Sequence, residues 1–347
     1  MRESPGSSDS PRITVGVTTY NRPGLLRECV ESILRQTYPH FEILIGNDYV
    51  PGPVTFESLG IPPDPRIKIV NHPQNIGAYQ NNYYLIKNAG GDWFTWLADD
   101  DLMHPRFLEY AHEALSESKA LSFFCSYAAA ADPKRVFPIE NKPHGELSLM
   151  PGDDFIEEYA ARRIRAVGAY GVFKRQTWEA IYSTPRFGSG LAVYVDTFIP
   201  VVVAMLGPVA YRNFDLVFLR THAGSQSASS SQVGEYASAQ NDFLAEFRKT
   251  CHNRVSPERF DQWTGSFLWW FVQDGWHVVW RGSSSTLERL TAFAQYYDNP
   301  LRAHVPRRGA LVFHCKVAAL VLGDAARQFI SKIVRRTPSP AASSSHS

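Results

Sequence analysis

The sequence predicts an α/β fold, in which a mainly parallel sheet carries helices on both faces. Two observations predict this class. Strand-like and helix-like stretches alternate through the first half of the 347-residue chain, and polar clusters follow three of the strand-like stretches. Strands that alternate with helices pair in parallel, and the crossover helices cover both faces of the sheet. From residue 231 onward the apolar spacing is helical, which predicts a helical C-terminal extension.

Local patterns define the elements of the first half. Residues 13–17 alternate β-forming and small residues, and Pro23 can open a helix because proline is tolerated in a first helical turn. Gly90 and Gly91 stop another helix, as glycine does just past a helix end. Strands are therefore expected at 13–17, 41–45, 67–70, 93–97 and 121–127, with helices at 23–34, 77–89 and 105–118.

The second half shows a looser pattern. Helices are expected at 153–165, 176–182, 198–206, 236–249 and 260–280, and short strands at 172–173 and 217–219. These elements suggest one domain at 13–230, divided near residue 130, and a helical extension at 231–336. The ends of the chain, 1–12 and 337–347, are polar and of low complexity, so we expect a disordered lead-in and tail.

The charge of the chain limits its partners. A formal net charge of +1 is not typical of a polyanion-binding protein, so nucleic acid is not expected as a partner. The charge is uneven, because residues 301–347 hold eight Lys and Arg against one acid, Asp324. Within that segment the apolar stretch 309–323 has basic residues on both sides. It fits an amphipathic helix on an anionic membrane surface, and equally a docked C-terminal helix with a solvated basic tail.

Cysteine usage and apolar runs indicate the compartment. The four cysteines lie far apart without a Cys-x-x-Cys pair, which favours neither a zinc site nor a disulfide framework. A reducing compartment, the cytoplasm, is the simplest interpretation. The first residues show no signal-peptide pattern, and no run of about 18 apolar residues predicts a membrane span. We therefore expect a cytoplasmic protein. The basic C-terminal helix is also compatible with peripheral contact at the inner face of the membrane.

Asp99, Asp100 and Asp101 form the strongest local signal for chemistry. Three consecutive carboxylates after a buried strand repel one another, and a divalent cation would relieve that repulsion. Mg²⁺ and Mn²⁺ both suit carboxylate and phosphate oxygens. One aspartate before His104 and Pro105 would be explained by helix capping, but three exceed that need. The sequence therefore predicts a metal site here.

Polar residues also follow two other predicted strands, at Thr18–Tyr20 and at Asn47–Asp48. Because ligands of such sheets bind outside the carboxyl ends of the strands, we expect these clusters to converge with the three aspartates. Taken alone, Asp48 would be a turn residue, and Thr18 and Tyr20 would cap the next helix. Their shared position at strand ends favours a ligand site.

Motifs of several other enzyme classes are missing. No Gly-x-Gly-x-x-Gly follows the first strand and no P-loop occurs, which argues against nicotinamide-dependent enzymes and P-loop NTPases. No Gly-x-Ser-x-Gly elbow is present either.

Taken together, these residues give residues 13–127 a resemblance to family 2 glycosyltransferases of the GT-A fold. The matching motifs come in the order and at the spacings usual for that family, and they are specific only jointly. They are residues 15–23 (VGVTTYNRP), 32–38 (SILRQTY), 41–48 (FEILIGND), 75–77 (NIG), 81–82 (NN), 90–93 (GGDW) and 97–101 (LADDD), with Pro105.

The resemblance implies a site for a nucleoside-diphosphate sugar in the half before residue 130. Thr18, Tyr20 and Asp48 correspond to contacts with the nucleotide base, with Tyr20 stacking on the base and Asp48 accepting a hydrogen bond from it. Asp99 corresponds to a ribose contact. Asn75 belongs to the same donor site.

The resemblance also implies a divalent metal cofactor, Mn²⁺ or Mg²⁺. Asp100 corresponds to the carboxylate that bridges the metal and the diphosphate, and Asp101 to the second carboxylate of the pair. The chain departs from the family pattern at three positions, where acids are usual: Asn47, Ala98 and Val195.

A fainter resemblance covers the acceptor half, about 131–230. Residues 171–175 resemble the segment that lines the acceptor side, and Asp196 stands where relatives carry the catalytic base. Arg220 and His222 resemble a late segment in which His222 would reach the metal or diphosphate and Arg220 would pair with phosphate. Asp196 could instead cap the following helix, and His222 could be a surface histidine. Asp153 and Asp154 are a second candidate base, but fit better as acids in a first helical turn.

The function implied by the resemblance is metal-assisted transfer of a sugar to an acceptor hydroxyl, by single displacement with inversion. Expected acceptors are a glycan, a lipid-linked molecule or a small molecule, as in polysaccharide or glycoconjugate biosynthesis. Two alternatives stay open. One is a nucleotidyltransferase acting on a sugar phosphate, although the glycine-rich basic loop of that class is missing after the first strand. The other is a non-catalytic glycan-binding scaffold of the same fold.

Overall fold

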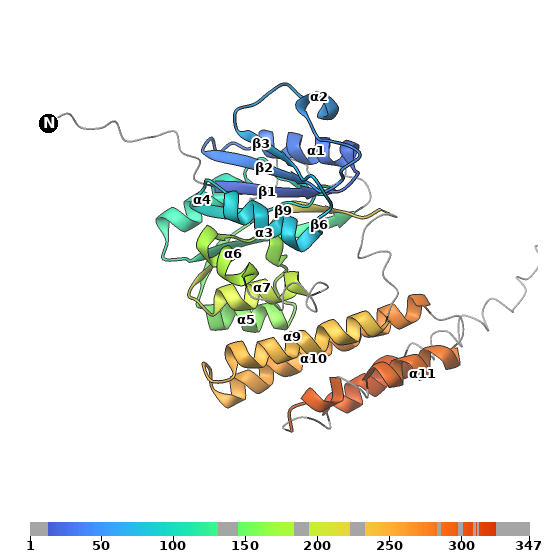
Figure 1. The fold of residues 1–347 in the computed structure, drawn as a ribbon. Helices are drawn as coiled ribbons and strands as arrows, with labels where there is room; N and C mark the ends of the chain where they lie inside the picture. The colour runs from blue at the N-terminus through green and yellow to red at the C-terminus, as the bar shows by residue number, and fades with distance from the viewer. Residues whose placement is uncertain are drawn as a thin grey trace, which may run out of the picture. The chain divides into compact units, whose positions relative to one another are not determined.

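The fold is described from a computed structural model of the chain (Figure 1). The structure describes residues 13–130, 145–183, 194–222, 233–282, 286–297, 301–307, 310 and 312–323. The expected lead-in at 1–12 and tail at 337–347 lie outside these ranges. Within them, nine strands form one mixed sheet accompanied by helices, which confirms the α/β class. None of the helices described is long and apolar enough to cross a membrane.

Four parallel strands form the first part of the sheet, and Figure 1 shows β1, β2 and β3 side by side. Their spatial order is β3-β2-β1-β4, so the chain moves outward from β1 to β3 and then returns to the other side of β1. Such a reversal leaves a crevice at the carboxyl ends of the two central strands, here β1 and β4. The four strands are β1 (Ile13–Thr19), β2 (Phe41–Asn47), β3 (Ile67–Asn71) and β4 (Trp93–Trp96).

Both faces of this part of the sheet are covered. Every residue of β2 and all of β1 except Thr18 are buried. Strands buried on both faces read as nearly continuous apolar runs, which is why both could be predicted. α3 packs on β1 and β2, and α4 on β6 and β9. The helices of this half are α1 (Pro23–Leu34), the short α2 (Phe56–Leu59), α3 (Ala78–Asn88) and α4 (Phe107–Glu117).

Gly16 allows the rings beside β1 to pack closely. It pairs with Trp96 on β4, and a Cβ at residue 16 would lie 2.6 Å from atoms of both the Phe94 and Trp96 rings. Those two rings meet edge to face, 4.7 Å apart. A side chain at residue 16 would push these two rings away from β1. Glycine therefore allows β4 to pair closely with β1, and this pairing places residues 99–101 beside the end of β1.

The second part of the sheet is mixed. β8 is antiparallel to β4 and β6, while β6 and β9 are parallel, and β9 also carries β5 and β7 in antiparallel pairing. β9 is much longer than the strand expected at 217–219, because its polar residues 212, 213 and 215 hide the strand pattern. The elements are β5 (Leu102–Met103), β6 (Ser122–Ala130), β7 (Leu147–Met150), β8 (Val172–Lys174) and β9 (Val209–Arg220).

Helices accompany this second part. Trp178 on α6 stacks on Phe173 of β8 with ring centroids 4.2 Å apart, and its indole N–H donates to the Phe94 carbonyl at 2.8 Å. α6 is thereby fastened to the strand that precedes the aspartates. The elements are α5 (Gly152–Ala160), the 3₁₀ turn η2 (Gly168–Tyr170), α6 (Arg175–Tyr182), α7 (Val195–Ala204) and α9 (Val233–Cys251).

The chain divides into two compact units. One comprises residues 1–230 and 238–256, and the other comprises 231–237 and 257–347. Within the first unit, Gln240 of α9 donates to the Tyr194 hydroxyl at 2.6 Å, just before α7. The second unit holds α10 (Pro257–Gly282), α11 (Thr286–Tyr296) and the 3₁₀ turn η5 (Arg302–His304). Trp263 and Phe267 of α10 are fully buried, as their helical spacing predicts.

Glu42 joins the edge of the parallel strands to the turn before β4. This buried side chain accepts hydrogen bonds from the Thr14 hydroxyl at 2.8 Å, from Lys68 Nζ at 2.7 Å and from the Gly90 amide. Burial alone would raise the pKa of Glu42, but the hydrogen bonds from Lys68, Thr14 and Gly90 outweigh it and hold the pKa below its usual value. The ionised form therefore stabilises the folded state.

We predict that Glu42→Gln destabilises the fold and reduces its sensitivity to acid. A depressed folded-state pKa gives stability that is full above the unfolded value of 4.5 and is lost as the pH falls through the folded value. At neutral pH the substitution should lower the free energy of unfolding by about 1–3 kcal/mol, because buried donors lose their charged acceptor. Urea unfolding at neutral pH and below the pKa of glutamate measures both effects.

A matched control is Glu31→Gln on α1. Glu31 pairs with Arg27 at 2.9 Å on the surface, and such pairs contribute at most about 1 kcal/mol. Equal effects of the two substitutions would contradict the role given to Glu42.

Candidate functional site

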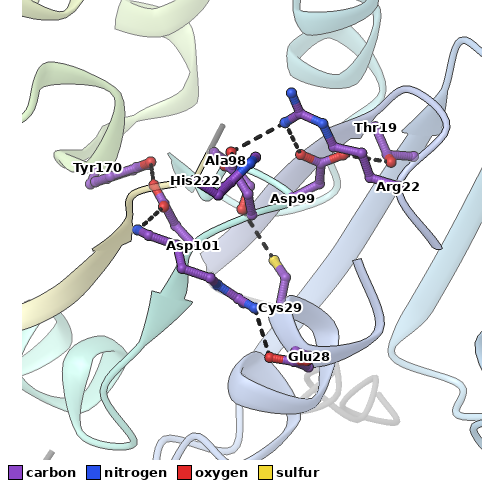
Figure 2. Close-up of polar contacts among 11 residues, drawn as sticks. Thr19, Arg22, Glu28, Cys29, Ala98, Asp99, Asp101, Tyr170 and His222 are labelled. Carbon is purple, nitrogen blue, oxygen red and sulfur yellow. Dashed lines mark hydrogen bonds and ion pairs between the residues drawn. The ribbon is translucent and has the colours of Figure 1, made fainter. Parts of the chain in front are cut away.

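The ends of β1 and β4 meet through a hydrogen bond. The Thr19 hydroxyl, at the last residue of β1, donates to Asp99 Oδ2 at 2.7 Å (Figure 2). Asp99 follows β4 and is only 5% exposed. Burial raises the pKa of Asp99, while the Thr19 hydrogen bond and the Arg22 charge act against that rise. The structure therefore places the first of the three aspartates at the reversal of strand order, where the topology predicts a ligand site.

Asp100 lies between two nitrogen groups. Arg22 Nη1 is 3.2 Å from Asp99 Oδ1 and 3.2 Å from Asp100 Oδ2, so one guanidinium nitrogen joins the two carboxylates. His222 Nε2 lies 3.0 Å from the same Asp100 oxygen. The structure thus brings His222 to the aspartates from 122 positions further along the chain.

Asp101 is buried. Its Oδ2 accepts a hydrogen bond from the Tyr170 hydroxyl, and its Oδ1 accepts one from the Arg220 backbone N–H at 2.8 Å (Figure 2). Burial raises the pKa of Asp101 to about 6, although both hydrogen bonds favour the ionised form. The Arg220 side chain turns to Glu28 on α1, with 2.7 Å between Nη1 and Oε2. Asp101 thereby ties η2 and the end of β9 to the end of β4.

Asp48 closes the end of β2. It is buried, and its two oxygens accept the backbone N–H groups of Ile76 and Gly77 at 2.7 and 2.8 Å. The Asn75 side chain accepts the same Gly77 N–H at 2.9 Å. Asp48 therefore fixes the turn that carries Asn75, which is exposed, to the strand end. The two residues predicted from separate motifs lie side by side.

Asn47 explains one departure from the family pattern. Its Nδ2 faces the Tyr49 carbonyl at 3.2 Å, the Gly52 carbonyl at 2.9 Å and Asn71 Oδ1 at 2.9 Å. Its own Oδ1 accepts the Tyr49 N–H at 3.1 Å. A carboxylate cannot donate to these acceptors. An amide at this position therefore holds the 49–52 turn against β3.

Tyr20 directly follows β1 and is 53% exposed. Its ring meets Tyr49 edge to face, with 5.2 Å between the ring centroids. Asn21 adopts a left-handed conformation with φ of 55°, and this turn directs the chain from Tyr20 into α1. Thr18 is partly exposed in the same strand end.

Asp196 lies in the first turn of α7 and accepts a hydrogen bond from the Ala169 backbone N–H. Solvent reaches the residue, yet the protein around its carboxyl group raises the pKa of Asp196 to about 6 by desolvation. Its negative charge also contributes to raising the pKa of Tyr170, which burial and Asp101 raise further. The turn η2 therefore contacts both regions, because its Tyr170 donates to Asp101 and its Gly168 packs against the Asp196 backbone.

The second candidate base lies on another helix. Asp153 and Asp154 occupy the first turn of α5, as expected, where the helix dipole stabilises acidic side chains.

Asp100 supplies carboxylate oxygens that suit a hard divalent cation, and the His222 ring nitrogen lies beside them. Among the described residues no group of three or more His, Cys, Asp and Glu side chains is arranged to hold a metal. Mg²⁺ and Mn²⁺ in nucleotide sites are commonly held by one or two carboxylates, with phosphate oxygens and water completing the shell. Asp100 is 14% exposed at its side chain, and His222 is beside it, so a ligand can complete such a shell.

Sequence reasoning assigned no role to three residues of this site: Thr19, Arg22 and Tyr170. Thr19 and Arg22 lie within the VTTYNRP motif. The polar side chain of Thr19 at the buried end of a strand could have indicated a hydrogen bond to a neighbouring strand end. Tyr170 has no local signal, because its contact with Asp101 spans 69 positions.

Comparison with known proteins agrees with this geometry. Residues 14–168 match the model of glycosyl transferase family 2. An uncharacterized glycosyltransferase of Rickettsia typhi is 27% identical over 151 residues, which are 43% of this chain and 44% of the relative. The O-antigen biosynthesis protein RfbC of Myxococcus xanthus is 36% identical over 104 residues, 29% of this chain and 8% of the relative.

Solved structures show the same fold. S. aureus TarS 1–349 in complex with UDP aligns with a TM-score of 0.57 at 13% sequence identity, over 91% of each chain. TarS 1–349 in complex with UDP-GlcNAc aligns with a TM-score of 0.50 at 14% identity, over 84% of this chain and 90% of that one.

The matched segment, residues 14–168, is therefore similar to glycosyl transferase family 2, and the chain shares the GT-A-type fold of TarS. The chain spans 44%, 19% and 15% of the lengths of three curated relatives that it matches, all of them Rickettsia glycosyltransferases.

Proposed function

We propose that the chain is a glycosyltransferase that moves a sugar from a nucleoside-diphosphate donor to an acceptor hydroxyl. The observation that carries the proposal is the convergence of three strand ends, at Thr19, Asp48 and Asp99, on the reversal of strand order in a domain similar to family 2. A structurally similar protein, TarS, binds UDP and UDP-GlcNAc, which supports the same ligand class here.

The donor would lie across the ends of β1, β2 and β4. The exposed Tyr20 ring suits stacking on the base, with Thr18 and Asp48 as polar base contacts and Asn75 beside them. Asp99, held by Thr19, would accept a hydrogen bond from a ribose hydroxyl.

The diphosphate would lie at Asp100 and His222. A divalent metal, Mn²⁺ or Mg²⁺, would supply positive charge that stabilises the leaving diphosphate. Asp100 would hold the metal, and His222 lies 3.0 Å from the Asp100 carboxylate. Asp101 is the next acid in the sequence. Asp101 is engaged with Tyr170 and the Arg220 N–H, so its part is to keep residues 99–101 in place. The Arg220 guanidinium, which pairs with Glu28, would lie at the same end of the sheet.

Asp196 would act as the general base. It would remove the proton from the acceptor hydroxyl, whose oxygen then attacks the anomeric carbon opposite the leaving diphosphate, so the sugar configuration inverts. A carboxylate with a pKa of about 6 is better matched to proton abstraction near neutral pH than one of ordinary value.

The acceptor and the compartment are part of the same proposal. The acceptor is a glycan, a lipid-linked molecule or a small molecule that presents a hydroxyl, and RfbC, a matching relative, acts in O-antigen biosynthesis according to its name. All four cysteines are free thiols, three of them buried, which supports a reducing compartment such as the cytoplasm.

Thermal unfolding against a panel of nucleoside diphosphates, with and without Mn²⁺, tests the donor site. One nucleotide should stabilise the chain in a metal-dependent manner, by about 2.7 kcal/mol at 100 times its dissociation constant. Asp100→Asn should abolish the part of the shift that depends on Mn²⁺. Asp92→Asn, an exposed acid just before β4, should leave it intact. A complete lack of shift with every nucleotide would contradict the donor site.

A pH profile with the matching nucleotide sugar tests the base. Because Asp196 must be deprotonated to act, kcat/KM should fall about tenfold per pH unit below the pKa of about 6. Asp196→Asn should lower kcat by about 10²–10⁴-fold, while Asp153→Asn on α5 should leave it within about threefold. An active Asp196→Asn enzyme with the same acid limb would assign the base to another group.

A further inference from the structure

The helix at 312–323, in the second unit, exposes apolar side chains. Val312 is 60% exposed and Leu322 is 67% exposed, the two highest values among the large hydrophobic residues of the described part of the chain. Single exposed apolar residues are ordinary, but a contiguous set on one face indicates an interaction surface.

The exposed residues share one face. At 100° per residue, Val312, Cys315, Ala319 and Leu322 fall within an arc of about 80°. All four are exposed, while Val317, on the other side of the helix, is only 7% exposed. The helix therefore packs through one side and presents a second apolar side to solvent. We call Val312, Cys315, Ala319 and Leu322 the outer face.

Basic residues accompany the outer face. Lys316 lies next to it and is exposed, and Arg302 and Arg307, just before the helix, are exposed as well. Residues 301–347 together carry eight Lys and Arg against one acid. A second copy of the chain would bring this positive charge against itself, whereas an anionic lipid surface would attract it.

We propose that the outer face lies on an anionic lipid bilayer as an interfacial helix. Apolar side chains at Val312 and Leu322 would enter the boundary between headgroups and acyl chains, with Lys316 at the level of the lipid phosphates. Two signals act together, a small apolar face and a basic segment, so binding is reversible and sensitive to lipid charge and to salt.

Vesicle flotation of the full chain tests this. The chain should float with phosphatidylcholine vesicles that contain phosphatidylglycerol, stay in solution with phosphatidylcholine alone, and dissociate at high salt. The double variant Val312→Asp and Leu322→Asp should lower the bound fraction by about tenfold or more. The control Leu121→Asp and Leu149→Asp changes two exposed leucines of the first unit and should float normally.

Three results would overturn the proposal. They are a wild-type chain that stays in solution with both vesicle types, a double variant that floats as well as wild type, and a wild-type dimer in light scattering that the double variant loses. Matching thermal unfolding curves establish that both double variants are folded.

A second inference comes from Arg22 and is independent of the first. Its Nη1 lies 3.2 Å from an oxygen of Asp99 and 3.2 Å from an oxygen of Asp100. That nitrogen therefore occupies the space between two carboxylates where a cation would be stabilised. The left-handed turn at Asn21 and the start of α1 direct the Arg22 side chain there.

We propose that Arg22 is an internal counter-cation, which balances Asp99 and Asp100 until a divalent metal arrives with the nucleotide. This inference rests on the proposed function. Binding of the metal on Asp100 would release the guanidinium, which can then pair with the diphosphate oxygens as a bidentate donor. Arg22 would thus weaken binding of the metal alone and strengthen binding of the metal together with the nucleotide.

Mn²⁺ binding, followed by the electron paramagnetic resonance signal of the free ion, tests this without an activity assay. Arg22→Gln should bind Mn²⁺ alone about tenfold more tightly than wild type, since a nearby charge changes the cation affinity of a carboxylate by that order. The same variant should lose affinity for the nucleoside diphosphate with Mn²⁺. Arg27→Gln, which removes a surface arginine of α1, should match wild type in both.

Unchanged or weaker binding of Mn²⁺ alone to Arg22→Gln would overturn the role of Arg22. The proposed function fails separately, because it requires a nucleotide- and Mn²⁺-dependent shift in wild type, whatever the variant does.

Discussion

The constraint on which the rest of the first unit depends is a run of three carboxylates after β4, in which Asp99 and Asp101 are buried and Asp100 is partly buried. A buried carboxylate is strongly unfavourable unless hydrogen bonds or opposite charges compensate it. Asp99 is compensated from the end of β1, Asp100 by Arg22 and His222, and Asp101 from η2 and β9. The partners come from positions as far apart as 19 and 222. The fold therefore has to close the sheet around residues 99–101 in order to be stable.

The same contacts connect the two halves of the site. Tyr170 of η2 donates a hydrogen bond to Asp101, and Gly168 of the same turn packs against the backbone of Asp196. The turn η2 therefore contacts both the three aspartates and the proposed base. The Arg220 N–H on Asp101 sets the end of β9, and His222 follows two residues later. A displacement of Asp101 would therefore move donor-side and acceptor-side groups together. Asp101 therefore has a structural role, while the neighbouring Asp100 is the residue proposed to bind a metal.

Much of the first half could be predicted from the sequence, because its strands are buried on both faces and its turns contain glycine and proline. The runs at 13–17 and 41–45 and the aspartates after β4 are local signals, and the structure places them as expected. The second half could not be predicted as well. β9 alternates polar and apolar residues irregularly, and β5 has only two residues. Contacts such as Tyr170 with Asp101 depend on tertiary packing, which leaves no periodicity in the chain.

The most direct measurement is a crystal structure of the chain with Mn²⁺ and the nucleoside diphosphate that stabilises it most. The account predicts the base against Tyr20 and Asp48, the ribose at Asp99, and anomalous scattering from Mn²⁺ within bonding distance of Asp100. It also predicts that Arg22 no longer bridges Asp99 and Asp100. A nucleotide bound away from the ends of β1, β2 and β4, or Mn²⁺ bound without Asp100, would contradict the account.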